Sequence, residues 1–374
     1  MKKILILKTF PLSLKNWNEV GIITRELKLY NRILDLYDNF SFSLVSYGNK
    51  EDLELINHIG NVKLLLPFKR FNNLNSYKKF ILSFFIPLIL KKDFQNTNFI
   101  QTNQFRGSWV AIIAKVLFKK KIILRIGFEY YDFQKKLKKN IIYLILLKYL
   151  SKIVYNFSDN IIVTTEDIKI FIIQTFGINE KKITIIPNYI DTDLFKKINV
   201  TSKNNLLFIG RLNEQKNLFN VFKALKGLNA ELDLIGHGER KQYLKLSTDL
   251  KIKVNFIDNI KNDQLTKIYN SCKIFLLCSN FEGNPKTLLE AMACECAILC
   301  TNVDGIRNLV NSNNAMIVNQ DSSSIKEGLE KLLSDDKLRI HLSSNTRKEI
   351  LARNSINVIL KKLLNFYEML NIND

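Results

Sequence analysis

Two glutamates, Glu282 and Glu290, are acidic residues whose spacing suggests that they belong to one ligand-binding site. Glu282 lies in a turn rich in Gly and Asn, and Pro285 follows where a helix would begin, since that position needs no amide hydrogen. At about 1.5 Å per residue, Glu290 would lie about 7.5 Å along this helix, near its mouth. Helix N-termini attract anions such as a diphosphate, and carboxylates beside them can accept hydrogen bonds from a polyol. The segment therefore predicts a site for a ligand with phosphate and hydroxyl groups.

A second segment brings two cations to the end of an expected strand. Residues 205–209 form an apolar run, and Gly210, Arg211 and Lys216 follow before a helix expected over residues 218–228. Ligands of open α/β sheets bind at the carboxyl ends of strands, and glycine there lets the backbone approach a ligand. Alone, these residues are more typical of an exposed helix cap with surface charges. Their place about 70 residues before Glu282 favours an anion site.

These motifs resemble those of a known family. The Glu-x7-Glu spacing, with Gly283 after the first Glu and Ala-Met-Ala after the second, resembles the donor-sugar motif of family 4 glycosyltransferases. The segment 210–217 is similar to the family's Gly-Arg-Leu…Lys-Asn element, and residues 187–195 resemble its crossing between lobes, with Tyr189 in place of the usual Gly. The resemblance implies an α/β protein of the GT-B fold, with two Rossmann-like lobes, parallel sheets and an active site in the interlobe cleft.

The resemblance also assigns roles on the donor side. Arg211 and Lys216 would neutralise the leaving diphosphate, Glu282 would bind the transferred sugar, and Glu290 would accept hydrogen bonds from ribose. Catalytic roles are thus expected for Glu282, Arg211 and Lys216. Asp258 or its neighbour Asn259 would meet the base. The expected donor-binding residues are Gly210, Arg211, Lys216, Gly236, Asp258, Gly283, Asn284, Pro285, Lys286, Thr287 and Glu290.

The first lobe departs from the family pattern. The usual Gly-Gly loop after the first strand is replaced by residues 8–21, where Trp17 would line the cleft or belong to the core. The stretch 122–129 lacks the His that many members place there. Residues at the ends of expected strands would take over contact with the acceptor. The candidates are Lys15, Asn16, Asn103, Gln104, Arg125 and Glu129.

Strand and helix patterns alternate along the whole chain, which favours parallel sheets. A length of 374 residues exceeds one hydrophobic core. We expect an acceptor-side lobe over residues 1–190, a donor-side lobe over 191–354 and a last helix over 355–374 that returns to the first lobe. Strands are expected near residues 3–7, 42–46, 62–66, 99–102, 122–125, 161–164, 205–209, 231–235, 254–257, 274–278, 297–301 and 315–318. Helices are expected near residues 17–36, 77–90, 109–118, 140–157, 166–176, 218–228, 285–293, 323–333, 337–353 and 355–371.

The formal net charge of +21 lies mainly in the first half. Residues 1–186 hold 30 Lys and Arg against 14 Asp and Glu, a net charge of +16, and the rest carries +5. A basic cluster at residues 135–139 precedes an apolar helix expected over 140–157, a combination that suits the surface of an anionic membrane. Solvated lysines of a biased composition are the alternative. Nucleic-acid binding is disfavoured, because the aromatic residues lie in apolar runs rather than among the basic residues.

The remaining features point to a reducing compartment and a reaction without metal. The cysteines (Cys272, Cys278, Cys294, Cys296 and Cys300) form no zinc pattern, and free thiols explain them best. No apolar stretch is long enough for a membrane span, and the start reads as a strand rather than a signal peptide, so we expect a cytoplasmic protein at the inner face of the membrane. Asp191 and Asp193 suit a boundary turn better than a cation. The two cations near the diphosphate make a metal cofactor unnecessary.

These observations and the resemblance together predict a hexosyl-type glycosyltransferase, and the resemblance alone implies that it retains the anomeric configuration. Its donor would be a nucleotide-diphosphate sugar, and its acceptor a glycan or a lipid-linked glycan of cell-surface polysaccharide synthesis. The altered first loop and the missing His leave open an inactive two-lobed protein that binds nucleotide or glycan. Hydrolysis of the donor by the purified protein would distinguish the two.

Overall fold

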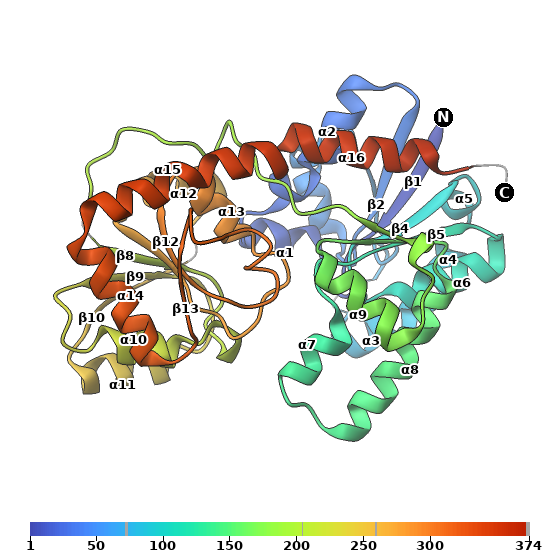
Figure 1. Ribbon diagram of the computed structural model, residues 1–374. Coiled ribbons are helices and arrows are strands. Elements are labelled where there is room, and N and C mark those ends of the chain that lie inside the picture. Colours follow the sequence, from blue (N-terminus) through green and yellow to red (C-terminus); the bar gives the residue numbers. More distant parts are fainter. Residues whose placement is uncertain (72–73, 204, 259, 372–374) are drawn as a thin grey trace. The chain divides into compact units, whose positions relative to one another are not determined.

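The computed structural model describes residues 1–71, 74–203, 205–258 and 260–371. The chain forms two compact units, Met1–Ile186 with Leu360–Asp374 and Pro187–Ile359. Each unit is a parallel sheet flanked by helices (Figure 1). The chain thus enters the second unit at Pro187 and returns to the first at Leu360.

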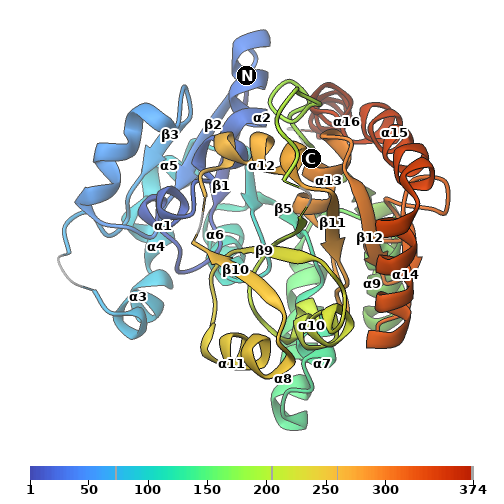
Figure 2. The same cartoon turned by 90° about the vertical axis from the view of Figure 1, so that its left-hand side faces the viewer.

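The first unit contains a seven-stranded parallel sheet in the order β3-β2-β1-β4-β5-β6-β7. Its strands are β1 Lys2–Leu7, β2 Phe40–Val45, β3 Lys63–Leu65, β4 Phe99–Thr102, β5 Lys121–Arg125, β6 Asn160–Val163 and β7 Ile183–Ile185. The helices of this unit are α1 Leu14–Glu19, α2 Ile23–Leu36, α3 Ser76–Ser83, α4 Ile86–Ile89, α5 Lys91–Gln95, α6 Ser108–Phe118, α7 Tyr130–Lys136, α8 Ile141–Phe157 and α9 Glu166–Phe176, with short 3₁₀ helices η1 Lys50–His58 and η2 Glu180–Lys182. In both views α7 and α8 extend from the unit as a helical hairpin (Figures 1 and 2).

The second unit contains a six-stranded parallel sheet in the order β10-β9-β8-β11-β12-β13. Its strands are β8 Leu206–Ile209, β9 Glu231–Ile235, β10 Lys253–Ile257, β11 Ile274–Leu277, β12 Ala297–Thr301 and β13 Met316–Val318. The helices are η3 Glu214–Lys216, α10 Leu218–Leu225, α11 Lys241–Leu250, η4 Asn262–Gln264, α12 Leu265–Ser271, α13 Lys286–Ala293, α14 Ser322–Ser334 and α15 Asp336–Arg353. The last helix, α16 Ile356–Met369, begins in this unit and continues into the first. Figure 2 views this unit from its β10 edge. The central strands are continuous apolar runs because helices cover both faces; all four residues of β11 have 0% exposure.

Two predicted helices are each divided in the structure. The helix predicted over residues 17–36 becomes α1 and α2, because Gly21 adopts φ +65° between them and Ser13 with Asn16 forms a capping box that starts α1. The helix predicted over residues 77–90 becomes α3 and α4. Pro87 lies in the first turn of α4, where a missing amide hydrogen is tolerated. The helix α7 was not predicted, and neither were α5, β7 and η1.

The last helix, α16, packs into the first unit through buried hydrogen bonds. The Tyr367 hydroxyl donates to Gln101 Oε1 at 2.7 Å, and Gln101 Nε2 donates to the Tyr30 hydroxyl at 2.8 Å. The Lys2 ammonium donates to the carbonyl oxygens of Tyr367, Glu368 and Leu370. These bonds join the first strand to the last helix.

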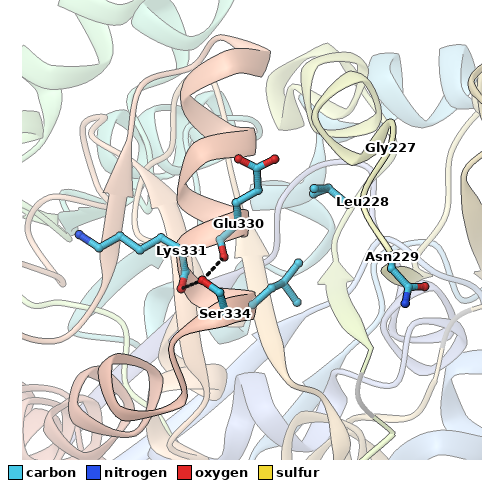
Figure 3. A pocket seen from close by; sticks show the side chains of 7 residues that line it. Gly227, Leu228, Asn229, Glu330, Lys331 and Ser334 are labelled. Atoms are coloured by element: carbon cyan, nitrogen blue, oxygen red, sulfur yellow. Dashed lines mark hydrogen bonds between the residues drawn. The ribbon is translucent and has the colours of Figure 1, made fainter.

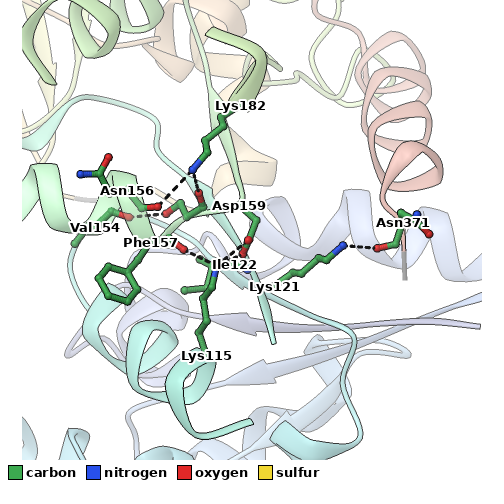
Figure 4. Close-up of polar contacts among 10 residues, drawn as sticks. Lys115, Lys121, Ile122, Val154, Asn156, Phe157, Asp159, Lys182 and Asn371 are labelled. Atoms are coloured by element: carbon green, nitrogen blue, oxygen red, sulfur yellow. Dashed lines mark hydrogen bonds and ion pairs between the residues drawn. The ribbon is translucent and has the colours of Figure 1, made fainter. Parts of the chain in front are cut away.

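Polar side chains also form hydrogen bonds at the edge of this sheet where its strands begin (Figure 4). Asp159 accepts hydrogen bonds from the Ile122 amide and the Lys115 ammonium, both at 2.7 Å. Lys121 Nζ donates to Asn371 O at 3.0 Å. Among the helices that the structure describes, none combines the length and the apolar character that crossing a bilayer requires.

Candidate active site

The helix α13 begins directly after the loop that carries Glu282. Its N-cap residue is Pro285, with φ −71° and ψ 114°, so Pro285 precedes the helix rather than forming its first residue as predicted. Proline offers no side-chain acceptor to the first-turn amides, and Leu289 N is bonded to Pro285 O at 3.3 Å. Lys286 and Thr287 are partly exposed in this first turn. The start of α13 thus has the features of an anion-binding helix end.

Glu282 is held in a buried network by side chains from two loops. Lys216 forms an ion pair with Glu282 Oε1, and the Ser279 hydroxyl donates to the same oxygen at 2.6 Å. Gln215 Nε2 donates to Glu282 Oε2 at 3.2 Å and to Phe281 O at 3.0 Å. The side chains of Glu282 and Lys216 are only 6% and 10% exposed. The structure therefore joins the two predicted motifs through a direct charge pair.

Gln215 and Ser279 were missed by the sequence reasoning. Ser279 immediately precedes the predicted loop, and its carbonyl accepts from the Thr301 hydroxyl at 2.6 Å. Gln215 is next to Lys216 in the sequence, but its spacing did not predict a hydrogen bond with Glu282, which lies 67 residues later. Both residues orient Glu282, since they fix its two oxygen atoms in place.

Two glycine-containing loops lie side by side after β8 and β9. Leu212 N donates to His237 O at 2.9 Å, and Gly236 adopts φ +147°. A Cβ at Gly236 would lie 1.9 Å from Gly210 O, so only glycine fits there. Arg211 is exposed beside this contact. Gly210 and Gly236 therefore shape the backbone that presents Arg211 at the carboxyl ends of these strands.

A third glycine, Gly305, supports the loop of Glu282 from the segment after β12. It adopts φ +79°, and a Cβ at this position would lie 2.0 Å from Gly283 O and 2.9 Å from the carbonyl carbon of Glu282. The sequence reasoning missed this residue. Its signal was the Asp304-Gly305 pair after a predicted strand, a typical turn sequence.

Glu290 lies on the buried face of α13 and has 1% exposure. The Tyr269 hydroxyl, from α12, donates to Glu290 Oε2 at 2.8 Å. Burial and the neighbouring Glu290 carboxylate raise the pKa of Tyr269 well above its ordinary value, which keeps this hydroxyl protonated as a donor. The axial rise placed Glu290 correctly along the helix, but it did not give the direction of its side chain.

Asp258 lies at the end of β10 and is highly exposed, with its side chain 2.9 Å from the Arg240 guanidinium. Arg240 also donates to Gly236 O at 2.9 Å and to Ile257 O at 2.8 Å. This arginine thereby joins the loops after β9 and β10. The neighbouring Asn259, also considered for base contact, lies outside the described residues.

Asn284 is nearly buried and holds the crossing segment instead of pointing to solvent. Its carbonyl accepts from Asn188 Nδ2 at 2.8 Å, and its side-chain oxygen accepts from Asn188 N at 3.3 Å. Asn354 Nδ2 in turn donates to Asn188 O at 2.9 Å. The Pro-Asn element recognised in the sequence thus packs against the Glu282 loop within the second unit.

The residues predicted on the acceptor side mostly serve local structure. Lys15 pairs with Glu51 at 2.8 Å, and the Asn16 side chain closes the capping box of α1. Asn103, Gln104 and Arg125 do lie at the carboxyl ends of β4 and β5. Gln104 Oε1 accepts from Gly127 N at 3.2 Å, and Arg125 approaches the Tyr30 hydroxyl at 3.4 Å.

Glu129 is buried, with 4% exposure, and it is the N-cap of α7. Its oxygens accept from the Asp132 amide at 2.5 Å and from the Tyr155 hydroxyl at 2.8 Å. Burial raises its pKa above the ordinary value for a glutamate. Glu129 therefore anchors the start of α7, and its contact with an acceptor stays a prediction.

Lys8 is a buried cation at the end of β1 that the sequence reasoning did not single out. It has 1% exposure, donates to Ser13 O at 2.6 Å and lies 3.6 Å from the centre of the Trp17 ring. Burial lowers the pKa of Lys8 to about 7, against the opposing influence of Asp52 and Glu26. Trp17 thus belongs to the core, and the loop that replaces the family's Gly-Gly element folds over a lysine.

We expect stability to rise with pH because of Lys8. Its folded pKa of about 7 lies below the value of 10.5 for a free lysine, so between these values only the unfolded chain binds the proton. The contribution has a slope of up to about 1.4 kcal/mol per pH unit. Denaturant unfolding at pH 7, 8 and 9 should show this rise for the wild type, and Lys8→Met should flatten it. An equal slope in both proteins would contradict the assignment.

The described part of the second unit has a pocket of about 510 Å³, but it lies away from these residues (Figure 3). Gly227, Leu228 and Asn229 line it just before β9, opposite Glu330 and Ser334 near the end of α14. It therefore opens at the edge where strands begin, whereas Glu282 and Arg211 follow strand ends. Among the described residues, no group of three His, Cys, Asp or Glu side chains is arranged to hold a metal.

Comparison with known sequences matches two family models. The model described as "Glycosyltransferase Family 4" matches residues 43–194, and "Glycosyl transferases group 1" matches residues 190–349. An uncharacterized glycosyltransferase of Methanocaldococcus jannaschii is 26% identical over 235 residues, which are 57% of this chain and 60% of that protein. The matched region thus covers less than two thirds of that relative.

Other relatives match over more of their length. The "N-acetylgalactosamine-N,N'-diacetylbacillosaminyl-diphospho-undecaprenol 4-alpha-N-acetylgalactosaminyltransferase" of Campylobacter jejuni is 29% identical over 71% of this chain and 75% of its own. The "Capsular polysaccharide biosynthesis glycosyltransferase CapM" of Staphylococcus aureus is 26% identical over 88% of this chain and 90% of its own.

Solved structures share the fold. HepE of Anabaena, in complex with UDP-glucose, has a TM-score of 0.76 at 16% identity and covers 99% of this chain and 100% of its own. A glycosyltransferase of Rickettsia africae has a TM-score of 0.74 at 19% identity, with 98% of both chains covered. With two family models that together span residues 43–349 and two parallel-sheet units of the GT-B type, the chain belongs to the family 4 glycosyltransferases.

Proposed function

We propose that this glycosyltransferase moves a hexosyl-type sugar, with retention of configuration, from a nucleotide-diphosphate donor to a glycan or lipid-linked acceptor of cell-surface polysaccharide synthesis. The observation that carries the donor half is the buried pair of Glu282 and Lys216 beside the start of α13. The acceptor half is supported by the Campylobacter jejuni relative, whose name specifies a diphospho-undecaprenol acceptor, and by the capsular polysaccharide relative.

The reaction breaks the bond between the sugar carbon and the diphosphate oxygen and forms a bond to an acceptor hydroxyl, whose proton is released. Lys216 and Arg211 neutralise the charge that develops on the diphosphate, and the amides at the start of α13 bind its oxygens. Glu282, held by Gln215 and Ser279, accepts hydrogen bonds from the donor sugar. Glu290 binds the ribose hydroxyls from the side of α13. No divalent metal takes part in this proposal.

The two glutamates should differ when nucleoside diphosphate binding and transfer are measured separately. Glu290→Gln should weaken binding of the product nucleotide about tenfold or more, because a hydrogen bond to a charged group is worth about 1.5–3 kcal/mol. Glu282→Gln should leave that affinity nearly unchanged and lower turnover. Calorimetry with UDP, GDP and ADP, beside release of these nucleotides from their sugars, would measure both quantities.

Tyr269→Phe is the matched control for Glu290, since it removes only the hydrogen bond to that carboxylate. We expect about fivefold weaker nucleotide binding for this variant. Nucleotide affinity equal to wild type in Glu290→Gln would contradict the placement of ribose. Failure of the wild type to release nucleotide from any sugar donor, with acceptor present, would favour the inactive alternative.

We also propose that the first unit contacts an anionic membrane from the cytoplasmic side through α8. Its buried stripe includes Leu144, Leu147 and Val154, yet its outward side is apolar as well. The outward apolar side chains, 40–67% exposed, are Ile141, Ile142, Tyr143, Ile145, Leu146, Tyr149, Leu150, Ile153 and Phe157. A helix that is apolar all round requires a second apolar environment.

Charge supports a bilayer as that environment. The helix α8 contains Lys148 and Lys152 and no acidic residue, and exposed lysines at 135, 138 and 139 precede it. Each lysine near an anionic surface contributes about 1 kcal/mol. In the same unit, the segment from α3 to α4 adds exposed Tyr77, Phe85 and Leu88. Membrane contact would bring the enzyme to a lipid-linked acceptor.

Vesicle sedimentation should separate the two contributions. The wild type should sediment with anionic vesicles at low salt, and changing Lys135, Lys138 and Lys139 to Gln should release it. Changing Ile142, Leu146 and Leu150 to Gln should weaken binding that persists at high salt, because these residues form one exposed stripe with four-residue spacing. Equal sedimentation of all three proteins would contradict the proposal. Transfer to a soluble acceptor should be unchanged in both variants.

A further inference from the structure

Two cysteines of the second unit share one hydrogen-bond acceptor. Cys272, which directly follows α12, and Cys296, which precedes β12, both place Sγ 3.2 Å from Tyr269 O. All five cysteines are free thiols in the structure. Burial, and then a hydrogen bond with the Cys272 thiol, raises the pKa of Cys296 well above its ordinary value. The two sulfur atoms are therefore neighbours, 24 positions apart in the sequence.

Their exposure differs in a way that gives them different roles. Cys296 is 4% exposed, whereas Cys272 is partly exposed and lines a cavity of about 120 Å³. Lys197, Lys273, Glu295 and Arg339 line the same cavity, and Cys296 also belongs to its lining. The thiolate is the form that reacts with oxidants, and an oxidant can reach it only at an accessible thiol. Cys272 is thus the accessible thiol, and Cys296 is the buried one next to it.

We propose that Cys272 and Cys296 are a modification site that hydrogen peroxide or a small-molecule disulfide converts to an intramolecular disulfide. With peroxide, the Cys272 thiolate attacks one oxygen, the O–O bond breaks, and after protonation Cys272 sulfenic acid and water result. The Cys296 thiol then displaces the sulfenic oxygen as a second water, and the S–S bond forms. With a disulfide oxidant, Cys272 first forms a mixed disulfide, which Cys296 resolves with release of one thiol.

The pair is connected to the donor site through Tyr269, a consequence that rests on the proposed function. The Tyr269 carbonyl accepts from both thiols, and its hydroxyl donates to Glu290. A disulfide removes both S–H donors and ties the end of α12 to the turn at Glu295, which adopts φ +57°. Oxidation therefore displaces the tyrosine that orients Glu290 and weakens binding of a nucleoside diphosphate.

Thiol counting tests the site without any assumption about catalysis. The reduced full-length protein is treated with hydrogen peroxide or oxidised glutathione, unfolded and labelled with a maleimide, and its intact mass is measured. We expect five labels before oxidation and three after it, with peptide mapping that joins Cys272 to Cys296. Under peroxide, Cys296→Ser should form no disulfide, and with oxidised glutathione it should retain a mixed disulfide at Cys272.

Cys278→Ala is the matched control, because Cys278 is a buried thiol of the same unit, directly after β11 and with 1% exposure, and this variant should still form the disulfide. Five labels after oxidation of the wild type, or a disulfide that survives in Cys272→Ser, would overturn the proposal. UDP, GDP and ADP affinity tests the second part. Oxidation should weaken binding about fivefold, reversed by dithiothreitol. Unchanged affinity would overturn the link to Glu290, and failure of the reduced protein to bind any of the three would overturn the proposed function, leaving the disulfide standing.

Discussion

Lys216→Ala is expected to lower kcat by about 10²–10³, the usual effect of removing one preorganised charge at a leaving group. Lys216 has 8% exposure and is paired with Glu282, so it is not a freely moving surface lysine. Its substitution removes the positive charge proposed to lie beside the diphosphate. Glu282 then keeps only its hydrogen bonds with Gln215 and Ser279. Both effects act on the transition state, and we therefore expect kcat to fall more than nucleotide affinity.

The same substitution should also destabilise the fold, since an unpaired buried charge costs about 3–5 kcal/mol. Rates must therefore be compared well below the unfolding transition of the variant. Arg211→Lys is the companion variant, because exposed Arg211 keeps its charge but loses the planar guanidinium. We expect a smaller loss there, without loss of stability. Near-normal turnover in folded Lys216→Ala would contradict a role at the leaving group.

Transfer measured in excess EDTA tests the accompanying proposal that no metal is needed. Lys216, Arg211 and the amides of α13 would supply the positive charge for the departing diphosphate. Activity should therefore persist in EDTA. Loss of activity that added magnesium restores would overturn the metal-free mechanism, whatever the two variants show.

Gly305→Ala is expected to have the second large effect, on both stability and activity. The new Cβ would lie 2.0 Å from Gly283 O, which real Cβ atoms do not tolerate, so the loop of Glu282 must move. The positive φ alone costs about 1–2 kcal/mol, and the steric overlap adds to it. We expect a total loss of about 3 kcal/mol or more in unfolding free energy, with turnover strongly reduced.

Gly177→Ala provides a matched control for the backbone term. Gly177 ends α9 with φ +69°, close to the φ +79° of Gly305, but a Cβ there has no heavy atom within 4 Å. Gly177→Ala should therefore lose only about 1–2 kcal/mol and keep its activity. Urea unfolding and transfer rates of both variants would check this. Equal destabilisation by the two substitutions would show that Gly305 does not support the Glu282 loop.

Much of the fold follows from local patterns in the sequence. The strands β4, β9 and β12 have the predicted bounds, because buried parallel strands are rich in apolar residues on both faces. The helix α9 begins and ends at the predicted residues, with Thr165 as its cap and Gly177 after its end. The division of the helix predicted over residues 17–36 was missed because the 3.6-residue pattern continues across Gly21. Its positive φ becomes known only from the folded backbone.

The candidate site divides in the same way. The sequence predicted Lys216 after a strand and Glu282 in a turn that leads into a helix, and sheet topology brings such loops together. The direction of a side chain was not predictable from spacing: Glu290 turns inward because Tyr269, on another helix, provides its hydrogen-bond donor. Glu129 lies at a strand end too, but a helix that follows it uses the carboxylate as a cap. Lys8 escaped notice because a buried lysine contradicts the usual distribution of that residue.

The hydrogen bonds of α16 affect how much of the first unit can be completed while the chain is still being synthesised on the ribosome. Tyr367, which completes the buried chain of hydrogen bonds with Gln101 and Tyr30, is synthesised 266 residues after Gln101. At about 5–20 residues per second, roughly 13–53 s pass between the synthesis of Gln101 and the synthesis of Tyr367. The second unit ends at Ile359 and is fully translated first. A nascent chain thus carries a first unit that lacks its last helix until α16 has been translated, after the whole of the second unit.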